Sequence, residues 1–163
     1  MGKAANSSIS LKQIHVTDNF WNKYVHLVKD VIIPYQWDIL NDKLEDVETS
    51  HCIENFKIAA GEKEGEFQGA VFQDTDVAKW LEAVGFVLNY ERDEKLEELA
   101  DETIELIGRA QQPDGYLNTY FTIKEPDGRW SNLMEGHELY TAGHMIEAAV
   151  AYYEATGKKK FLD

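Results

Sequence analysis

Two histidines lie on what the residue spacing predicts to be one face of a helix. His137, Tyr140, Thr141 and His144 follow one another at intervals that place side chains on the same side of an α-helix. An imidazole beside a loop can hydrogen-bond a hydroxyl-rich ligand or transfer a proton. The two imidazoles are about two turns, roughly 10 Å, apart, which is too far for both to bind one metal ion. We therefore predict His137 as a ligand-binding residue, and His144 as either a second one or a hydrogen-bonded core histidine.

A second candidate pair, Gln36 and Trp37, follows Pro34 closely. A glutamine amide can hydrogen-bond sugar hydroxyls, and an indole face can pack on the C–H side of a sugar ring. Core packing explains Trp37 more simply. Gln36 is the polar contact that this pair predicts.

Two carboxylates, Asp74 and Asp76, precede a segment with helical periodicity. Paired carboxylates can act as acid and base in glycoside hydrolysis. Aspartates at this position also cap helices by accepting hydrogen bonds from the first backbone N–H groups. Capping is the simpler interpretation, and contact of Asp74 with a sugar hydroxyl is the alternative.

The one cysteine, Cys52, restricts the thiol chemistry of the chain. A single cysteine forms neither an intramolecular disulfide nor a metal site with several thiolates. Its neighbour His51 does not face it on a helix, because adjacent side chains point about 100° apart. The sequence contains no glycine-rich phosphate loop, G-x-S-x-G or H-E-x-x-H motif. Neither a cysteine nucleophile nor a metal site is predicted for this chain.

Composition excludes several classes of partner. The 30 Asp and Glu residues against 16 Lys and Arg give a net charge of −14, which argues against binding to nucleic acid. Hydrophobic residues make up 44% of the 163 residues, enough for a folded core. No apolar run is long enough to span a membrane, and the first ten residues lack the apolar region of a signal peptide. Asn6 stands where a myristoylation signal needs Ser or Thr. The expected location is the cytoplasm, without a membrane partner.

The elements that position these residues are predicted to be helices within residues 19–163, after a polar segment, 1–18. Thr17 or Asp18 is expected to cap the first helix, and Pro34 to split it near Ile33, because proline lacks an N–H and crowds the preceding turn. Residues 61–69 are predicted to form a loop, and residues 117–123 a brief strand. The predicted helices are 19–43, 51–59, 76–89, 93–110 and 138–156.

An internal similarity relates two of these helices. At an offset of 65 residues, Leu-Glu-Ala at 81–83 matches Ile-Glu-Ala at 146–148. Each copy contains a helix, a polar turn and the start of another helix, which predicts an α-solenoid or an α/α toroid. We expect either the N-terminal portion of a longer toroid or a chain that oligomerises, because apolar residues of the last helix have no following helix to cover them. These residues are Ile146, Ala149, Val150, Tyr152 and Tyr153.

Three motifs identify a family that the chain resembles. F-x-D-[ST]-D-V-x-K-W-x-E-A spans residues 72–83, Q-x-P-D-G-Y-L-x-[TS]-Y spans 111–120, and G-H-E-L-Y-x-A-G-H-x-I-E-A-A-V spans 136–150. Together these motifs resemble the N-terminal part of glycoside hydrolase family 127, the β-L-arabinofuranosidases, over about residues 20–163. The resemblance implies an all-α fold, a truncated part of an (α/α)6 barrel. It also implies that the full-length enzyme hydrolyses terminal L-arabinofuranosyl residues.

The resemblance further implies where the catalytic groups lie. In this family a zinc-bound cysteine thiolate attacks the anomeric carbon, a glutamate is the general acid/base, and one glutamate and three cysteines hold the zinc. All of these residues lie beyond the matched region, and Cys52 matches none of the ligands. What carries over to this chain is contact with the arabinofuranoside through Gln36 and His137, with His144 and Asp74 as further candidates. His137 is preferred to His144 because it lies nearest the loop.

Two other functions stay open at this point. One is a non-catalytic α-helical binding or interaction module that dimerises through its uncovered helices. The other is a different (α/α)6 sugar hydrolase, such as an unsaturated glucuronyl hydrolase, in which a carboxylate pair of this region would be essential.

Overall fold

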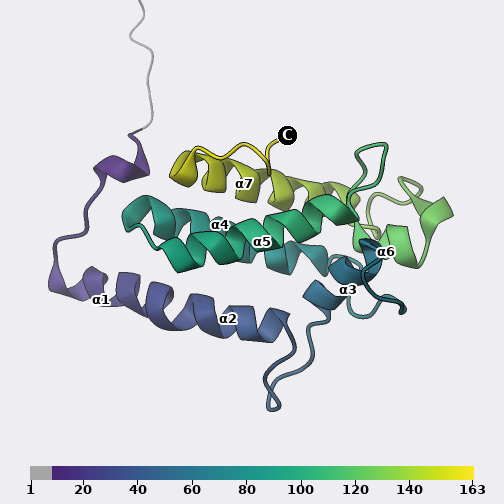
Figure 1. Ribbon diagram of the computed structural model, residues 1–163, viewed down its shortest axis with the longest axis horizontal. Helices are drawn as coiled ribbons and strands as arrows, with labels where there is room; N and C mark the ends of the chain where they lie inside the picture. Colours follow the sequence, from purple (N-terminus) through teal and green to yellow (C-terminus); the bar gives the residue numbers. More distant parts are fainter. Residues whose placement is uncertain (1–8) are drawn as a thin grey trace, which may run out of the picture.

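The protein is helical throughout the part that the computed structural model describes, residues 9–163, and no strand occurs in that range. The α-helices are α1 (Asn19–Leu27), α2 (Ile33–Leu40), α3 (Cys52–Ala59), α4 (Asp74–Tyr90), α5 (Glu94–Ala110), α6 (Thr119–Ile123) and α7 (Glu138–Thr156) (Figure 1). The all-α prediction is confirmed. Of the predicted polar segment 1–18, residues 1–8, with Asn6, lie outside the described part.

Aspartate side chains fix where two of the helices begin. Of the two predicted caps of α1, Asp18 is the one used: its carboxylate accepts hydrogen bonds from the backbone N–H groups of Phe20, at 3.0 Å, and Trp21, at 2.8 Å. Asp93 starts α5 in the same way. These side chains satisfy backbone donors that have no partner inside the helix.

Pro34 divides the first predicted helix, as expected. Between α1 and α2, residues 28–32 form a π-helical turn, in which the N–H of Ile33 donates to the carbonyl of Val28. The α-helical pattern resumes at Ile33, with Pro34 in the first turn of α2, and the π-helical turn before it accommodates the missing N–H of Pro34. The carbonyl of Ile33 also accepts a hydrogen bond from the indole of Trp80, at 3.1 Å, which ties α2 to α4.

Two local predictions are wrong. The strand expected at 117–123 is absent, because Asn118 instead starts the short helix α6 by accepting a hydrogen bond from the N–H of Phe121. Helix α4 begins at Asp74 rather than at residue 76. Asp74 is therefore the first residue of α4, and its carboxylate accepts hydrogen bonds from Thr119 instead of capping the helix.

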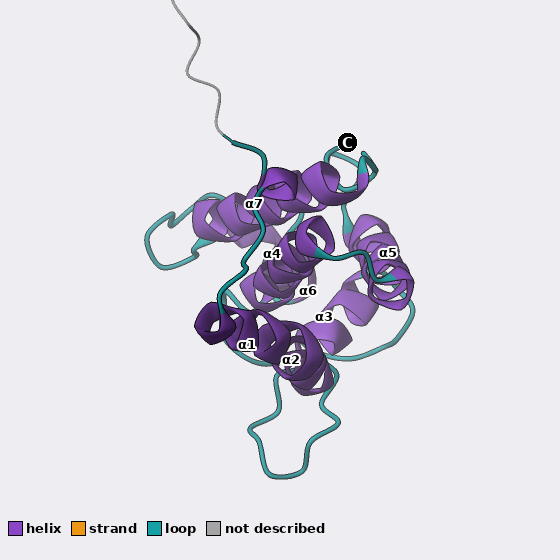
Figure 2. Cartoon of the chain, turned by 90° about the vertical axis from the view of Figure 1, so that its left-hand side faces the viewer, coloured by secondary structure: helices purple, strands orange, loops and turns teal. Residues whose placement is uncertain are grey.

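The helices form two rows. Helix α4 lies between α2 and α7, and α3 and α5 flank this row on one side (Figure 2). Helices α4 and α7 approach closely at Gly85, where an added Cβ would lie only 2.8 Å from the carbonyl carbon of Ala151. The two helices related by the internal similarity are therefore neighbours in space, as a toroid of repeated hairpins requires.

The core lies between the rows, and two apolar faces outside it stay exposed. Phe56, Leu81 and Tyr152 are almost fully buried. On α1 and the following turn, aromatic and aliphatic side chains are exposed, with Trp21 at 61%. On α7, Ile146, Val150 and Tyr153 are exposed as predicted, but Ala149 and Tyr152 are buried, which corrects the prediction for these two. Tyr152 faces α5, where its hydroxyl donates to Asp101 at 2.7 Å.

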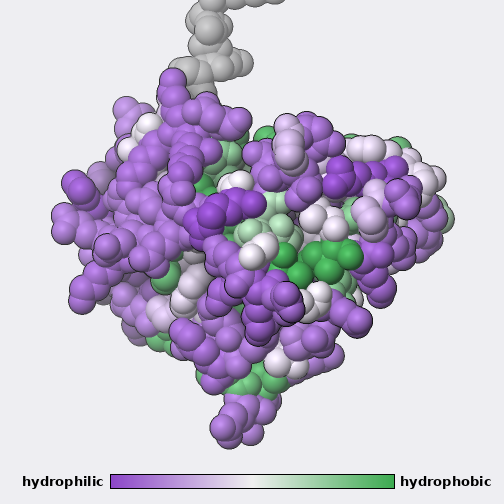
Figure 3. All heavy atoms as spheres, turned by 45° about the vertical axis from the view of Figure 1, so that its right-hand side comes forward, coloured by the Kyte–Doolittle hydropathy of each residue, from purple (hydrophilic) through white to green (hydrophobic). Residues whose placement is uncertain are grey.

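The surface toward the right-hand side of Figure 1 is mostly hydrophilic and is interrupted by an apolar patch (Figure 3). No helix within residues 9–163 is both long and apolar enough to cross a membrane.

Candidate functional site

The N-terminal ends of α4 and α7 lie toward the right-hand end of the molecule in Figure 1, and α2 packs against α4. Helix N-termini present free backbone N–H groups, and loops at such an end can carry binding residues. Gln36 lies on α2, and His137 immediately precedes α7.

Gln36 borders a pocket of about 710 Å³ between α2 and α4. Across this pocket lie Gln73, Asp76 and Lys79 of the α4 end. The amide of Gln73 donates to the carboxylate of Asp76 at 2.8 Å, and desolvation raises the pKa of Asp76 above its ordinary value. The pocket thus combines amide, carboxylate and ammonium groups, a set suited to binding hydroxyl groups.

Trp37, next to Gln36, belongs to the packing rather than to this pocket. Its ring lies 4.5 Å from that of the buried Trp80, with an angle of 33° between the planes. Stacking of this kind supports the core interpretation of Trp37.

His137 belongs to a second group of side chains, in which aromatic and imidazole rings pack against one another near the start of α7. Its imidazole lies 5.2 Å from the ring of Phe72, nearly perpendicular to it, and 6.0 Å from Tyr140. His144 continues the group, with its ring 4.6 Å from that of Tyr140. The side chains of His137, Tyr140 and His144 therefore lie next to one another, as their spacing predicted, whereas Thr141 is fully buried.

Lys79 connects the pocket to the ring group. Its ammonium lies at the pocket and donates to the Tyr140 hydroxyl at 3.0 Å and to the Thr75 hydroxyl at 3.2 Å. Sequence reasoning did not single out Lys79 or Phe72, although both belong to the motif at residues 72–83. The intervals of three and four residues from Phe72 to Thr75, Asp76 and Lys79 are the signal that could have identified them.

Glu138 holds the backbone around His137. Its buried carboxylate accepts hydrogen bonds from the Tyr116 hydroxyl and from the N–H of Trp130, at 2.7 Å. Burial and this carboxylate raise the pKa of Tyr116 above its ordinary value. His137 itself has a left-handed backbone, with φ of 51°, which is uncommon outside glycine. Glu138 therefore holds the loops that contain Tyr116 and Trp130 against the start of α7, next to His137.

Asp74 lies inside the protein, with 2% of its surface exposed. Both of its carboxylate oxygens accept hydrogen bonds from Thr119, one from the hydroxyl and one from the backbone N–H at 2.7 Å. Burial raises its pKa to about 6, against the hydrogen bonds from Thr119, which lower it. Asp74 thus ties α4 to α6, and the predicted pairing with Asp76 as a catalytic acid and base is not formed around an open site.

Cys52 offers no thiolate to a ligand. It is fully buried, its thiol donates to the carbonyl of Gln73 at 3.4 Å, and burial raises its pKa well above the ordinary value. A zinc centre with three cysteine ligands does not fit this chain, which has one cysteine.

Comparison with known proteins shows the family to which the chain belongs. Residues 13–163 match the family model described as the catalytic domain of GH127 β-L-arabinofuranosidases. The chain belongs to glycoside hydrolase family 127. The non-reducing end β-L-arabinofuranosidase of Bifidobacterium longum subsp. longum is 41% identical over 166 residues, which cover 92% of this chain and 25% of that enzyme.

Solved GH127 structures have the same helix arrangement. The crystal structure of a GH127 β-L-arabinofuranosidase from Geobacillus stearothermophilus T6 matches with a TM-score of 0.90 and 65% identity, over 91% of this chain and 24% of that one. A second GH127 β-arabinofuranosidase matches with a TM-score of 0.85 and 35% identity, over 95% of this chain and 25% of the other. This GH127 chain spans about a quarter of the length of these relatives, and its helices are a sector of the family's helical barrel.

Proposed function

We propose that this chain forms the N-terminal part of a β-L-arabinofuranosidase and supplies one wall of its sugar pocket. The relatives are named for that activity. The observation that carries the proposal is that Gln36 lines the same pocket as Lys79, and Lys79 donates a hydrogen bond to Tyr140, whose ring lies 6.0 Å from that of His137.

In this proposal the side chains of the wall have different roles. The Gln36 amide and the His137 imidazole each offer a donor and an acceptor to the hydroxyls of an arabinofuranoside. Lys79 orients Tyr140 beside His137 through the hydrogen bond from its ammonium to the phenol. Asp74 positions α4 against α6 rather than touching the sugar, because both of its oxygens are already used.

The proposal places bond cleavage elsewhere. The zinc and the thiolate chemistry that the family resemblance implies belong to helices outside this chain, and no catalytic residue is assigned here. The same helices would cover the exposed apolar faces of α1 and α7, with a second copy of the chain as the alternative cover.

A chimera tests the proposal in a working enzyme. The chain replaces the corresponding segment of the Geobacillus enzyme, which is 65% identical to it. In this chimera, we expect Gln36→Ala and His137→Ala each to lower kcat/KM for a β-L-arabinofuranoside about ten- to a hundredfold, the loss of one or two hydrogen bonds to the reacting sugar.

The controls use the same residue types away from the site. Gln13 and His15 are exposed near the N-terminus, and Gln13→Ala and His15→Ala are expected to leave kcat/KM within about twofold of the chimera. An active chimera whose kcat/KM does not respond to the Gln36 and His137 substitutions would contradict the proposed sugar contacts.

A further inference from the structure

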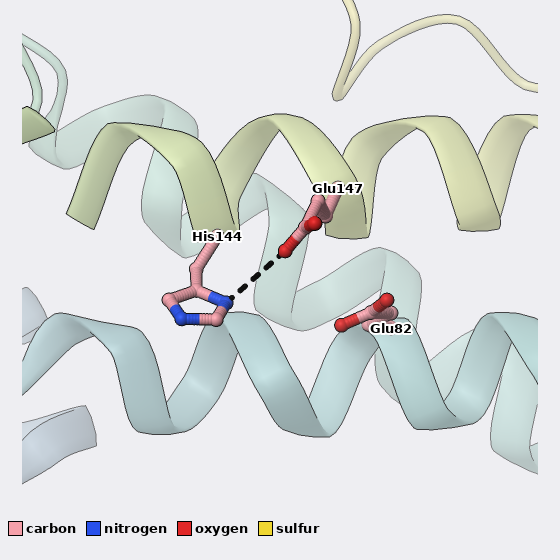
Figure 4. A group of neighbouring side chains, drawn as sticks. All are labelled: Glu82, His144 and Glu147. Atoms are coloured by element: carbon pink, nitrogen blue, oxygen red, sulfur yellow. Dashed lines mark ion pairs between the residues drawn. The ribbon is translucent and has the colours of Figure 1, made fainter. Parts of the chain in front are cut away.

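A cluster of three potential metal ligands bridges α4 and α7, away from the pocket at Gln36. Glu82 comes from α4, and His144 and Glu147 come from α7 (Figure 4). One ligand atom from each residue lies within 4.8 Å of the others, and this is the one group of three or more such side chains among residues 9–163.

The internal repeat explains why the cluster forms. Glu82 and Glu147 occupy equivalent positions in the two copies of the 65-residue similarity. Helices α4 and α7 pack side by side, so the equivalent glutamates come close together. His144, one turn before Glu147, adds an imidazole, whereas the first copy has Lys79 at the equivalent position.

The geometry is close to that of a coordinated cation. The Nδ1 atom of His144 lies 3.3 Å from Oε2 of Glu147, and the ligand atoms around a tetrahedral Zn²⁺ are roughly 3.3 Å apart. Helical di-iron carboxylate proteins also combine a Glu and a His three residues apart on one helix with a Glu from another helix, in the order Glu-x-x-His rather than the His-x-x-Glu of this chain.

A second observation at His144 points to a missing partner. Its Nδ1 atom is buried and makes no hydrogen bond with any described residue, and its ion-pair contact at 3.3 Å is with Glu147, itself a member of the cluster. A buried nitrogen without a partner is costly. A cation seated between His144, Glu82 and Glu147 would satisfy this atom and neutralise both carboxylates.

We propose that Glu82, His144 and Glu147 form a binding site for one divalent transition-metal cation, which links α4 to α7. Imidazole together with carboxylates is a ligand set that Zn²⁺ accepts, and the carboxylates also suit Mn²⁺. Glu147 is 62% exposed and gives the cation a path from solvent. The site uses no cysteine and is independent of the proposed sugar contacts Gln36 and His137; it assigns His144 to the cation instead of the sugar.

Calorimetric titration with Zn²⁺ alone, after removal of metals by a chelator, tests the site in the 163-residue chain. We expect one Zn²⁺ per chain at pH 7.5 and weaker binding at pH 5.5, because a proton competes for the imidazole. Glu82→Gln, His144→Gln and Glu147→Gln are each expected to weaken binding about tenfold or more. The matched control is Glu154→Gln, which removes the same charge from an exposed position of α7.

Thermal unfolding supplies the second readout. Zn²⁺ at about a hundred times its dissociation constant is expected to raise Tm by roughly 5–10 °C in the unsubstituted chain and in Glu154→Gln, and not in Glu147→Gln. Glu147 is largely exposed, so that variant stays folded even if His144→Gln does not. No binding below about 1 mM Zn²⁺, or binding that Glu82→Gln and Glu147→Gln leave unchanged, would overturn the proposal.

Discussion

Two buried carboxylates, Asp74 and Glu138, hold loops against the first turns of α4 and α7. Both accept a pair of hydrogen bonds from a neighbouring segment. Both also lie at helix N-termini, where the helix dipole favours negative charge. The residues near the proposed sugar wall are thus positioned by side chains that themselves do not face solvent.

Asp74 makes stability depend on pH. Its pKa in the folded protein is about 6, above the ordinary value of 3.8. The stabilisation from its protonated form is therefore complete below about pH 4 and is lost as pH rises through 6. We expect raising the pH from 5 to 7.5 to lower the free energy of unfolding by about 1 kcal/mol through this group alone.

Asp74→Asn isolates that contribution. An asparagine can keep both hydrogen bonds to Thr119 if the hydroxyl of Thr119 turns to accept one. Urea unfolding at pH 5 and pH 7.5 should therefore show the pH dependence reduced by about 1 kcal/mol in Asp74→Asn. It should be unchanged in Asp127→Asn, which alters an exposed aspartate. Equal pH dependence in Asp74→Asn and the unsubstituted chain would contradict the raised pKa of Asp74.

For individual residues, the sequence predicted features that depend on local structure better than features that depend on how helices pack. The burial of Asp74 depends on contact with Thr119, and the proximity of Glu82 to His144 depends on how α4 and α7 are rotated about their axes. Neither quantity is encoded in local spacing. His137 was placed correctly before α7 because a helix boundary is a local property.

At the scale of helices, periodicity was the reliable signal. The predicted helix 138–156 agrees with α7 in both bounds, and the predicted split near Ile33 follows from the chemistry of Pro34 alone. The wrong strand at 117–123 involves a short aromatic segment with little periodicity. In this segment the side chain of Asn118 accepts a hydrogen bond from the N–H of Phe121, and this cap favours a helix.

The close contact of α4 with α7 depends on Gly85. Gly85→Ala is expected to lower the free energy of unfolding by about 1–3 kcal/mol, because the new methyl group would meet the backbone of Ala151. Gly108→Ala is the matched control, since a Cβ there meets nothing within 4 Å. On α5 this substitution should stabilise the protein by about 0.5–1 kcal/mol. Chemical denaturation measures the free energy of unfolding of both variants. An equal change in Gly85→Ala and Gly108→Ala would contradict the close contact of α4 with α7 at Gly85.

For the molecule as a whole, the exposed apolar faces of α1 and α7 are energetically unfavourable, because nothing in the described part of the chain covers them from water. Trp21 and Ile146 are 61% and 63% exposed, and apolar patches of this kind mark surfaces that another element covers. We expect the isolated chain to show an apparent mass that rises above 18.7 kDa with concentration. Trp21→Glu with Ile146→Glu should restore the mass of a monomer in equilibrium sedimentation.

The same double substitution distinguishes the two possible covers of these faces, which are the remaining helices of the barrel and a second copy of the chain. At concentrations where the isolated chain is monomeric, both side chains are largely exposed, so the free energy of unfolding should change by less than about 0.5 kcal/mol per residue. In the chimera with the Geobacillus enzyme, the remaining helices of the barrel would bury both positions, and a buried unpaired glutamate is strongly destabilising. A fall in Tm of the chimera beside an unchanged isolated chain therefore indicates that the barrel covers these faces. A chimera that tolerates both glutamates would show that the faces stay open in the whole enzyme.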